Sequence, residues 1–193
     1  IVIIPNAAGD ETAIATLFGA ATHWQANVSL DGDTSYVAEG GTAFQRDLFS
    51  LEDTAGMTQV ITSVKVRAYV RGTVAGTGVA KTSIKTNGVV YDGVNQNVGT
   101  AYANIDTDYA TNPQTSVAWT WAEINALQAG VVLKRPAAKQ TTRCTYVLVI
   151  VYFTIGTQTF YPITPVEVTP ATADAWTDIL GADFGVPSGA TGV

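Results

Sequence analysis

The clearest signal in the sequence is an alternation of apolar and polar residues with a period of two. Between Ile61 and Arg71, valines and an alanine occupy every second position, and lysine, arginine and tyrosine lie between them. This alternation predicts a strand that buries one face and shows the other to water, as in an antiparallel sheet. Residues 44–51 and 100–109 have the same character less regularly. Residues 78–86 and 88–91 flank Asn87-Gly88, a pair that tolerates positive φ and predicts a hairpin turn.

The segment 141–154 predicts the central strand of the core. From Tyr146 onward it is apolar on both faces, which is typical of a strand that lies in the middle of a sheet or between two packed layers. Cys144 lies near its start. We expect this cysteine to act as a small hydrophobic residue and not as a nucleophile.

One short helix is predicted near position 120. Thr120 and Glu123 have the spacing of a capping box, in which each satisfies a backbone N–H of the other. Trp121, Ile124 and Leu127 follow at i, i+3 and i+6 and share one face. We expect an amphipathic turn that closes one end of a β-sandwich.

The prolines divide the chain into two parts. Residues 1–154 predict one all-β antiparallel β-sandwich domain with one short helix. Residues 155–193, interrupted by Pro162, Pro165 and Pro170, predict an extended C-terminal arm or linker, or the start of a second β-module. Because a segment of this length cannot bury its own core, we expect its large apolar residues to be assembly contacts with a partner; they are Trp176, Ile179, Leu180 and Phe184.

Composition and charge exclude several functions. Only 13% of the 193 residues are charged, against about 25% in an average domain. The net charge of −6 and the pI near 4.5 argue against nucleic acid as a partner. The longest apolar run, residues 146–153, is far shorter than the ~20 residues that span a bilayer, so no membrane insertion is expected. The single cysteine excludes an intramolecular disulfide.

One acidic turn is a candidate cation site. Asp31 and Asp33 flank a glycine and could hold Ca²⁺ through their oxygens. A full calcium loop would continue with glycine and glutamate at its sixth and twelfth positions, where this chain has Tyr36 and Thr42. We therefore favour an acidic turn before a strand, and we expect no metal.

Enzyme chemistry finds little support in the sequence. His23 is the single histidine, and it has no second histidine or thiol at ligand spacing for zinc. The chain has no Gly-x-Ser-x-Gly motif to present a serine nucleophile. We expect His23 to pack beside Trp24. The prediction is a protein without catalytic residues and without a cofactor.

The aromatic residues are the candidates for ligand binding. Tyrosine and tryptophan combine an apolar face with a polar edge, which suits a sugar. Trp119 and Trp121 are two positions apart and cannot both face the core from one helical turn. They are possible glycan contacts, with packing in the core or against another subunit as the alternative.

Several phrases together carry a resemblance to a protein class. They are residues 4–12, His23-Trp24, residues 31–37, Asp47-Leu48-Phe49 and the helical segment 119–130 before the long strand. This combination resembles jelly-roll β-sandwich modules in structural proteins of tailed phages and related viruses. The resemblance implies a non-enzymatic virion component of a decoration layer, head fibre, collar or tail. It would form a homo-oligomer, dock on capsid or tail proteins, and lie at the extracellular surface of the virion.

A second function fits the same residues. A carbohydrate-binding module of a cell-surface or secreted multi-domain protein would also be a β-sandwich without a catalytic group. It predicts an exposed row of aromatic side chains on a sheet face or on loops. The two functions overlap, since a virion protein can also bind a host glycan.

Overall fold

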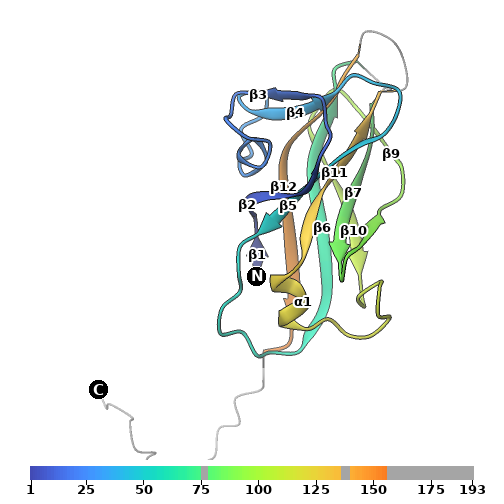
Figure 1. Ribbon diagram of the computed structural model, residues 1–193. Coiled ribbons are helices and arrows are strands. Elements are labelled where there is room, and N and C mark those ends of the chain that lie inside the picture. The colour runs from blue at the N-terminus through green and yellow to red at the C-terminus, as the bar shows by residue number, and fades with distance from the viewer. Residues whose placement is uncertain (75–77, 136–139, 156–193) are drawn as a thin grey trace, which may run out of the picture. The chain divides into compact units, whose positions relative to one another are not determined.

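Two antiparallel sheets of six strands each build the fold (Figure 1). The computed structural model describes residues 1–74, 78–135 and 140–155. The strands are β1 (Val2–Ile3), β2 (Pro5–Thr12), β3 (Thr16–Phe18), β4 (Tyr36–Glu39), β5 (Gln45–Leu51), β6 (Ile61–Gly72), β7 (Gly78–Thr86), β8 (Val89–Asp92), β9 (Gln96–Val98), β10 (Ala103–Tyr109), β11 (Gln128–Lys134) and β12 (Thr142–Phe153). The predicted all-β antiparallel sandwich is confirmed. No helix within the described ranges is long and apolar enough to cross a bilayer.

Sheet A has the strand order β10-β6-β12-β4-β3, and β1 pairs with β12. Strand β6 shows the predicted alternation, because Val64, Val66, Ala68 and Val70 are buried while the residues between them are partly exposed. Strand β12 pairs with β6 along almost its whole length. The expectation that β12 is buried on both faces is only half right. Its outward positions are partly exposed toward its end, and Tyr152 is 43% exposed.

Sheet B has the strand order β2-β5-β11-β7-β8, and β9 pairs with β7. The predicted hairpin joins β7 to β8 through Asn87 and Gly88, whose φ angles of 48° and 80° both lie in the left-handed region. Asparagine and glycine adopt this region at low cost. The turn residues therefore fix the register of these two strands.

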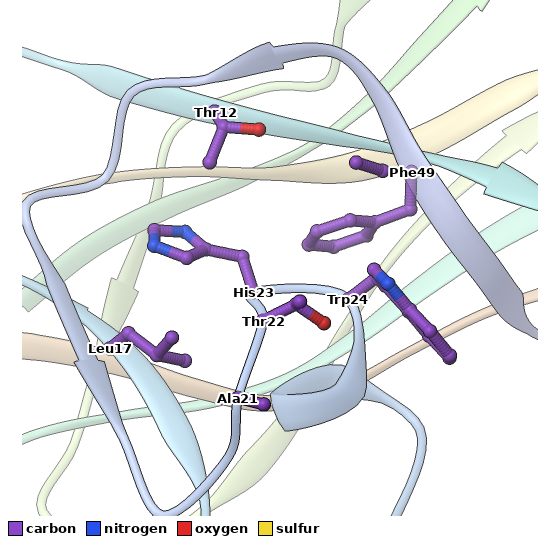
Figure 2. Close-up of a pocket in the computed structure, with 8 residues that line it drawn as sticks. Thr12, Leu17, Ala21, Thr22, His23, Trp24 and Phe49 are labelled. Atoms are coloured by element: carbon purple, nitrogen blue, oxygen red, sulfur yellow. The ribbon is translucent and has the colours of Figure 1, made fainter.

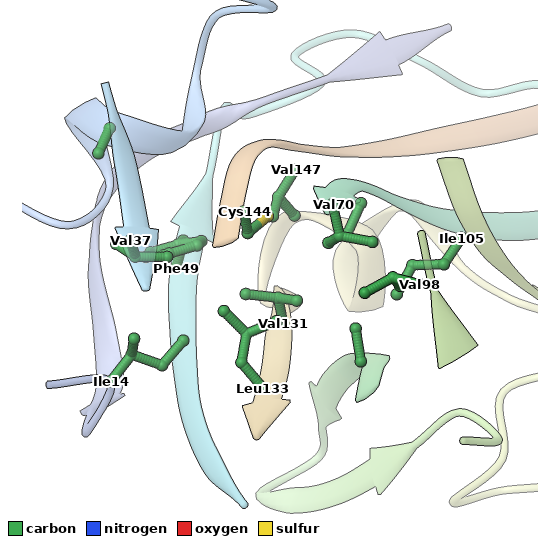
Figure 3. Packing of buried hydrophobic residues seen from close by; sticks show 13 residues of the cluster. Ile14, Val37, Phe49, Val70, Val98, Ile105, Val131, Leu133, Cys144 and Val147 are labelled. Carbon is green, nitrogen blue, oxygen red and sulfur yellow. The ribbon is translucent and has the colours of Figure 1, made fainter. Parts of the chain in front are cut away.

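The core lies between the sheets in two clusters. One cluster contains Phe49, Val70, Val131 and Cys144, and Figure 3 shows these side chains meeting between the strands. Burial raises the pKa of the Cys144 thiol to about 12, with the thiol fully buried. Cys144 is thus a small hydrophobic core residue, as predicted.

The second cluster is closed by the predicted helix α1 (Trp121–Asn125). Thr120 caps it: its side chain accepts a hydrogen bond from the Glu123 N–H, and the Glu123 carboxylate accepts one from the Thr120 N–H. Ile124 and Leu127 are buried against residues of both sheets, with Trp121 packed at the edge. The capping box and the apolar stripe are confirmed. A second short helix, η1 (Gln25–Asn27), lies in the connection between β3 and β4.

All of the proposed C-terminal arm except Ile155 lies outside the described ranges. The same holds for its four expected assembly contacts, Trp176, Ile179, Leu180 and Phe184. Self-assembly through these residues therefore stays a prediction.

Candidate functional site

The two tryptophans expected near a glycan lie at the α1 end of the sandwich. Trp119 precedes the helix, is 4% exposed and donates its indole N–H to the Tyr109 carbonyl at 3.2 Å. It leaves no ring face open to a sugar, so it is removed from the candidates. Trp121 donates to the Gln59 carbonyl at 2.7 Å and meets Phe153 edge to face, with the ring centroids 5.8 Å apart. Trp121 is thus mainly a packing residue that keeps part of its surface exposed.

The acidic turn uses its carboxylates inside the protein. Asp31 accepts hydrogen bonds from the hydroxyls of Ser35 and Thr145, both at 2.7 Å. Asp33 instead binds two arginines of sheet A. In the part of the chain that the structure describes, no three acidic, histidine or cysteine side chains are grouped to hold a metal ion. Both carboxylates therefore have protein partners, and the absence of a metal stays a prediction.

A small pocket lies beside His23, between β2, β3, β5 and the turn before η1. It has a volume of about 260 Å³, and Figure 2 shows Thr12, Leu17, His23 and Phe49 around it. Its walls are almost entirely apolar. Such a lining offers few hydrogen bonds to a hydroxyl-rich ligand.

The histidine at this pocket does more than pack beside Trp24. Its Nδ1 lies 2.6 Å from Oδ2 of the fully buried Asp47. The other carboxylate oxygen accepts the N–H groups of Ala13 and Ile14 at 2.9 and 3.0 Å. Burial raises the pKa of Asp47, and these hydrogen bonds and His23 act against that rise. The group joins three segments of chain, and among the described residues no hydroxyl or thiol bonds to His23.

The outer face of sheet A gathers aromatic and charged side chains. Tyr69 and Arg71 project outward from β6, between buried neighbours. Tyr146 is the direct partner of Tyr69 across β12, and Arg143 is the direct partner of Arg71. Directly opposed residues of an antiparallel pair share one face. We call this surface the tyrosine–arginine face; its members are Phe18, Asp33, Tyr36, Tyr69, Arg71, Tyr102, Arg143 and Tyr146.

Aromatic pairs flank this face at both sides. Phe18 of β3 stacks on Tyr36 of β4, with centroids 4.9 Å apart and planes 19° apart. Tyr69 stacks on Tyr102, which precedes β10, with ring centroids 5.3 Å apart and planes 16° apart. Phe18 is 51% exposed, while Tyr36 lies beneath it and is buried. The stacks fix the ring planes and leave Phe18 open to solvent.

An ion-pair network lies between the two aromatic pairs. Asp33 reaches Arg71 at 2.6 Å and Arg143 at 2.9 Å, and it accepts the Tyr102 hydroxyl at 3.0 Å. The Arg143 guanidinium lies 4.2 Å from the centre of the Tyr36 ring. The Arg71 guanidinium lies 5.3 Å from the centre of the Tyr102 ring. Both contacts are within cation–π range. Each charged group is therefore held in place before any ligand arrives.

The pKa shifts agree with this network. Burial opposes ionisation of Asp33, but hydrogen bonds from Arg143 and Tyr102 and the two arginine charges lower its pKa below the ordinary value. Burial, together with the hydrogen bond to Asp33, raises the pKa of the Tyr102 hydroxyl. At neutral pH Asp33 is thus charged, and Tyr102 keeps its proton as a donor.

The network continues along β6 and β10. Arg67 binds Asp106 through two hydrogen bonds of 2.7 and 2.6 Å, and Lys65 lies 3.5 Å from Asp106 and 3.4 Å from Asp108. The hydrogen bond from Arg67 lowers the pKa of Asp106. Alternating charges therefore extend the polar surface beside the aromatic residues.

No known protein family matches the sequence, and no curated protein matches it. Solved structures of similar shape include "Family 16 Carbohydrate Binding Module-2", with 9% identity, a TM-score of 0.42, and coverage of 74% of this chain and 89% of that one. Another is "CBM4 structure and function", with 9% identity, a TM-score of 0.38, and coverage of 70% and 92%. A family 11 carbohydrate-binding module from Clostridium thermocellum, in complex with a β-1,3-1,4-mixed-linked tetrasaccharide, has 9% identity, a TM-score of 0.37, and coverage of 78% and 89%. Assignment to a virion stays a prediction.

Proposed function

We propose that the β-sandwich is a non-enzymatic carbohydrate-binding domain that holds a glycan on the tyrosine–arginine face. One observation carries this proposal: stacked aromatic rings and ion-paired arginines occupy a single outer sheet face. With 9% identity to the carbohydrate-binding structures, no site can be transferred from them. The proposal rests on the side chains of this chain.

The side chains supply the two contacts that a sugar needs. An aromatic ring covers the apolar C–H face of a sugar, and polar groups at its rim bond the hydroxyls. Phe18, Tyr69 and Tyr102 offer ring surface, and the arginines and Asp33 offer donors and acceptors close by. Because the strands and ion pairs hold these groups, little conformational entropy is lost when a glycan binds. An extracellular setting, expected from the sequence, belongs to the same proposal.

The test is a glycan array with the full chain, followed by calorimetry of the best ligand. Replacing Tyr102 by alanine removes a ring and the hydroxyl that binds Asp33. We expect Tyr102→Ala to weaken binding by on the order of tenfold. The matched control is Phe44→Ala, since Phe44 is also half-buried and the Nζ atoms of Lys81 and Lys134 lie 4.2 and 4.3 Å from the centre of its ring.

Any of three results would contradict the proposal, one from the array and two from the variants. The first is an array on which the folded chain retains no glycan. The second is a Tyr102→Ala variant that binds as tightly as the natural chain, and the third is a Phe44→Ala variant that loses as much affinity as Tyr102→Ala.

A further inference from the structure

We infer that the glycan is acidic and that a sugar carboxylate binds beside Asp33, at the paired arginines Arg71 and Arg143. This inference rests on the proposed function and names the ligand class for the same face. Its basis is the charge balance and the unused hydrogen-bond donors of the two guanidinium groups.

Two arginines stand directly opposite each other in this sheet. Arg71 of β6 and Arg143 of β12 are Cα partners, and like charges in this position destabilise a strand pair. Asp33 is the one acid of the described residues within ion-pair distance of either. Two positive groups and one negative group leave a formal charge of +1, in a protein whose net charge is −6. An anionic ligand would complete the neutralisation.

The guanidinium groups also keep donors for a second carboxylate. Among the described residues, the Arg143 side chain makes one hydrogen bond, from Nη1 to Asp33 at 2.9 Å. Arg71 contacts Asp33 through Nη2 and donates Nη1 to the Thr100 carbonyl at 3.4 Å. Neither Nε has an acceptor among the described residues, but both are buried, so the donors left for a ligand from solvent are the remaining N–H groups of the Nη atoms. A guanidinium has five N–H donors in a planar fork that fits a carboxylate.

Asp33 shows that a carboxylate fits this position and leaves room. It bridges the two arginines, and its side chain is 46% exposed, while those of Arg71 and Arg143 are 24% and 22% exposed. The segment that carries it is fixed by Asp31, which binds Ser35 and Thr145. A sugar carboxylate can therefore approach from solvent beside Asp33 while the Phe18 and Tyr102 rings contact the sugar rings.

Calorimetry of the full chain with three oligosaccharides of equal length tests the inference: one neutral, one built of uronic acids and one sulfated. We expect the uronic acid oligosaccharide to bind most tightly. Its affinity should fall as salt is raised from 20 to 500 mM, since salt screens partly exposed charges; these concentrations span Debye lengths from roughly 20 to 4 Å. Arg143→Gln should weaken it by on the order of tenfold.

The direction in which Asp33→Asn changes the affinity for the uronic acid ligand is the decisive test. This variant raises the local charge from +1 to +2 and should tighten binding of the uronic acid ligand by on the order of fivefold. Weaker binding of the uronic acid ligand by the folded Asp33→Asn variant would overturn the inference, even though Asp33 can also accept a hydrogen bond from a sugar hydroxyl. Arg46→Gln is the charge control, because Arg46 belongs to an ion-pair network on sheet B, with Glu11 and Asp92. Thermal unfolding of each variant verifies that it is folded.

The outcomes separate the two claims. Equal affinity for neutral and acidic ligands without salt dependence overturns the inference and leaves the proposed function standing. Preference for the sulfated ligand over the uronic acid also overturns the carboxylate assignment. Absence of binding to all three, and to the array, refutes the proposed function itself.

Discussion

Gly130 sets the distance between two backbones in sheet B. It lies in β11 directly between Leu48 of β5 and Ser83 of β7. A Cβ atom at this position would lie 1.8 Å from the Asp47 carbonyl oxygen and 2.8 Å from its carbonyl carbon. Because backbone atoms cannot move aside as a flexible side chain can, only glycine fits here without displacing a strand.

The first prediction concerns this close approach. Gly130→Ala should lower the free energy of unfolding by about 3 kcal/mol or more, since overpacking against backbone forces the strands apart. Denaturant unfolding measures the change. Gly99→Ala is the control, because a Cβ there meets no heavy atom within 4 Å, and its effect should stay within about 0.5 kcal/mol. Equal effects at the two glycines would contradict this account.

Asp47 carries a second prediction at the same scale. Its carboxylate is fully buried and binds His23, Ala13 and Ile14. Asp47→Ala leaves the Ile14 N–H and His23 Nδ1 without their partner, while the Ala13 N–H keeps the Arg46 carbonyl, and it should cost about 3–5 kcal/mol of unfolding free energy. The control is Asp108→Ala, whose side chain is 63% exposed and contacts Lys65; an exposed pair is worth about 0–1 kcal/mol. A loss below about 1 kcal/mol for Asp47→Ala would show that the group is not a structural clamp.

The helix α1 is an element whose start depends on one side chain. Thr120→Ala removes the acceptor for the Glu123 N–H and should cost about 1 kcal/mol, the usual value of an N-cap. Thr111→Ala is a suitable control, because Thr111 is exposed outside any helix or strand. Denaturant unfolding at neutral pH compares the two. An equal cost for both threonines would mean that the capping box adds nothing to stability.

Elements with local signals were predictable from the sequence. The alternation in β6, the Asn87-Gly88 turn and the Thr120–Glu123 box each lie within a dozen neighbouring residues. Local steric and hydrogen-bonding preferences determine such features. For Trp119 the structure agrees with the packing alternative, because the residue lies before the helix and its ring enters the core.

The candidate site needed information that lies between distant segments. The alternation in β6 places Tyr69 and Arg71 on the exposed face from sequence alone. Their partner Arg143 comes from β12, and Tyr102 comes from the loop before β10. Asp33 comes from a turn about forty residues earlier in the chain. Strand register decides these neighbours, and a single sequence carries no direct signal for pairing at such separations. The His23–Asp47 contact was missed for the same reason.

At the scale of the whole molecule, ion pairs hold the outer faces of both sheets. The hydrogen bond from Arg67 lowers the pKa of Asp106 on sheet A. On sheet B, burial opposes ionisation of Asp92, but hydrogen bonds from Arg46 and Ser83 lower its pKa. On sheet A, burial likewise opposes ionisation of Asp33, but its arginine partners lower its pKa. The folded protein therefore binds these protons less readily than the unfolded chain does.

This difference fixes the direction of the pH dependence. A carboxyl with a lowered folded pKa stabilises the fold above its unfolded value, here about 3.8 for aspartate, and the stabilisation is lost as pH falls through the folded pKa. Burial raises the pKa of Asp47, so this group alone would make the fold more stable as the pH falls. The carboxyl groups with a lowered pKa outnumber it. Urea unfolding at pH 7, 5, 4 and 3 should show stability falling below about pH 4. Asp106→Asn should make that fall shallower, because the group that titrates is gone, while a stability that rises on acidification would show that Asp47 dominates.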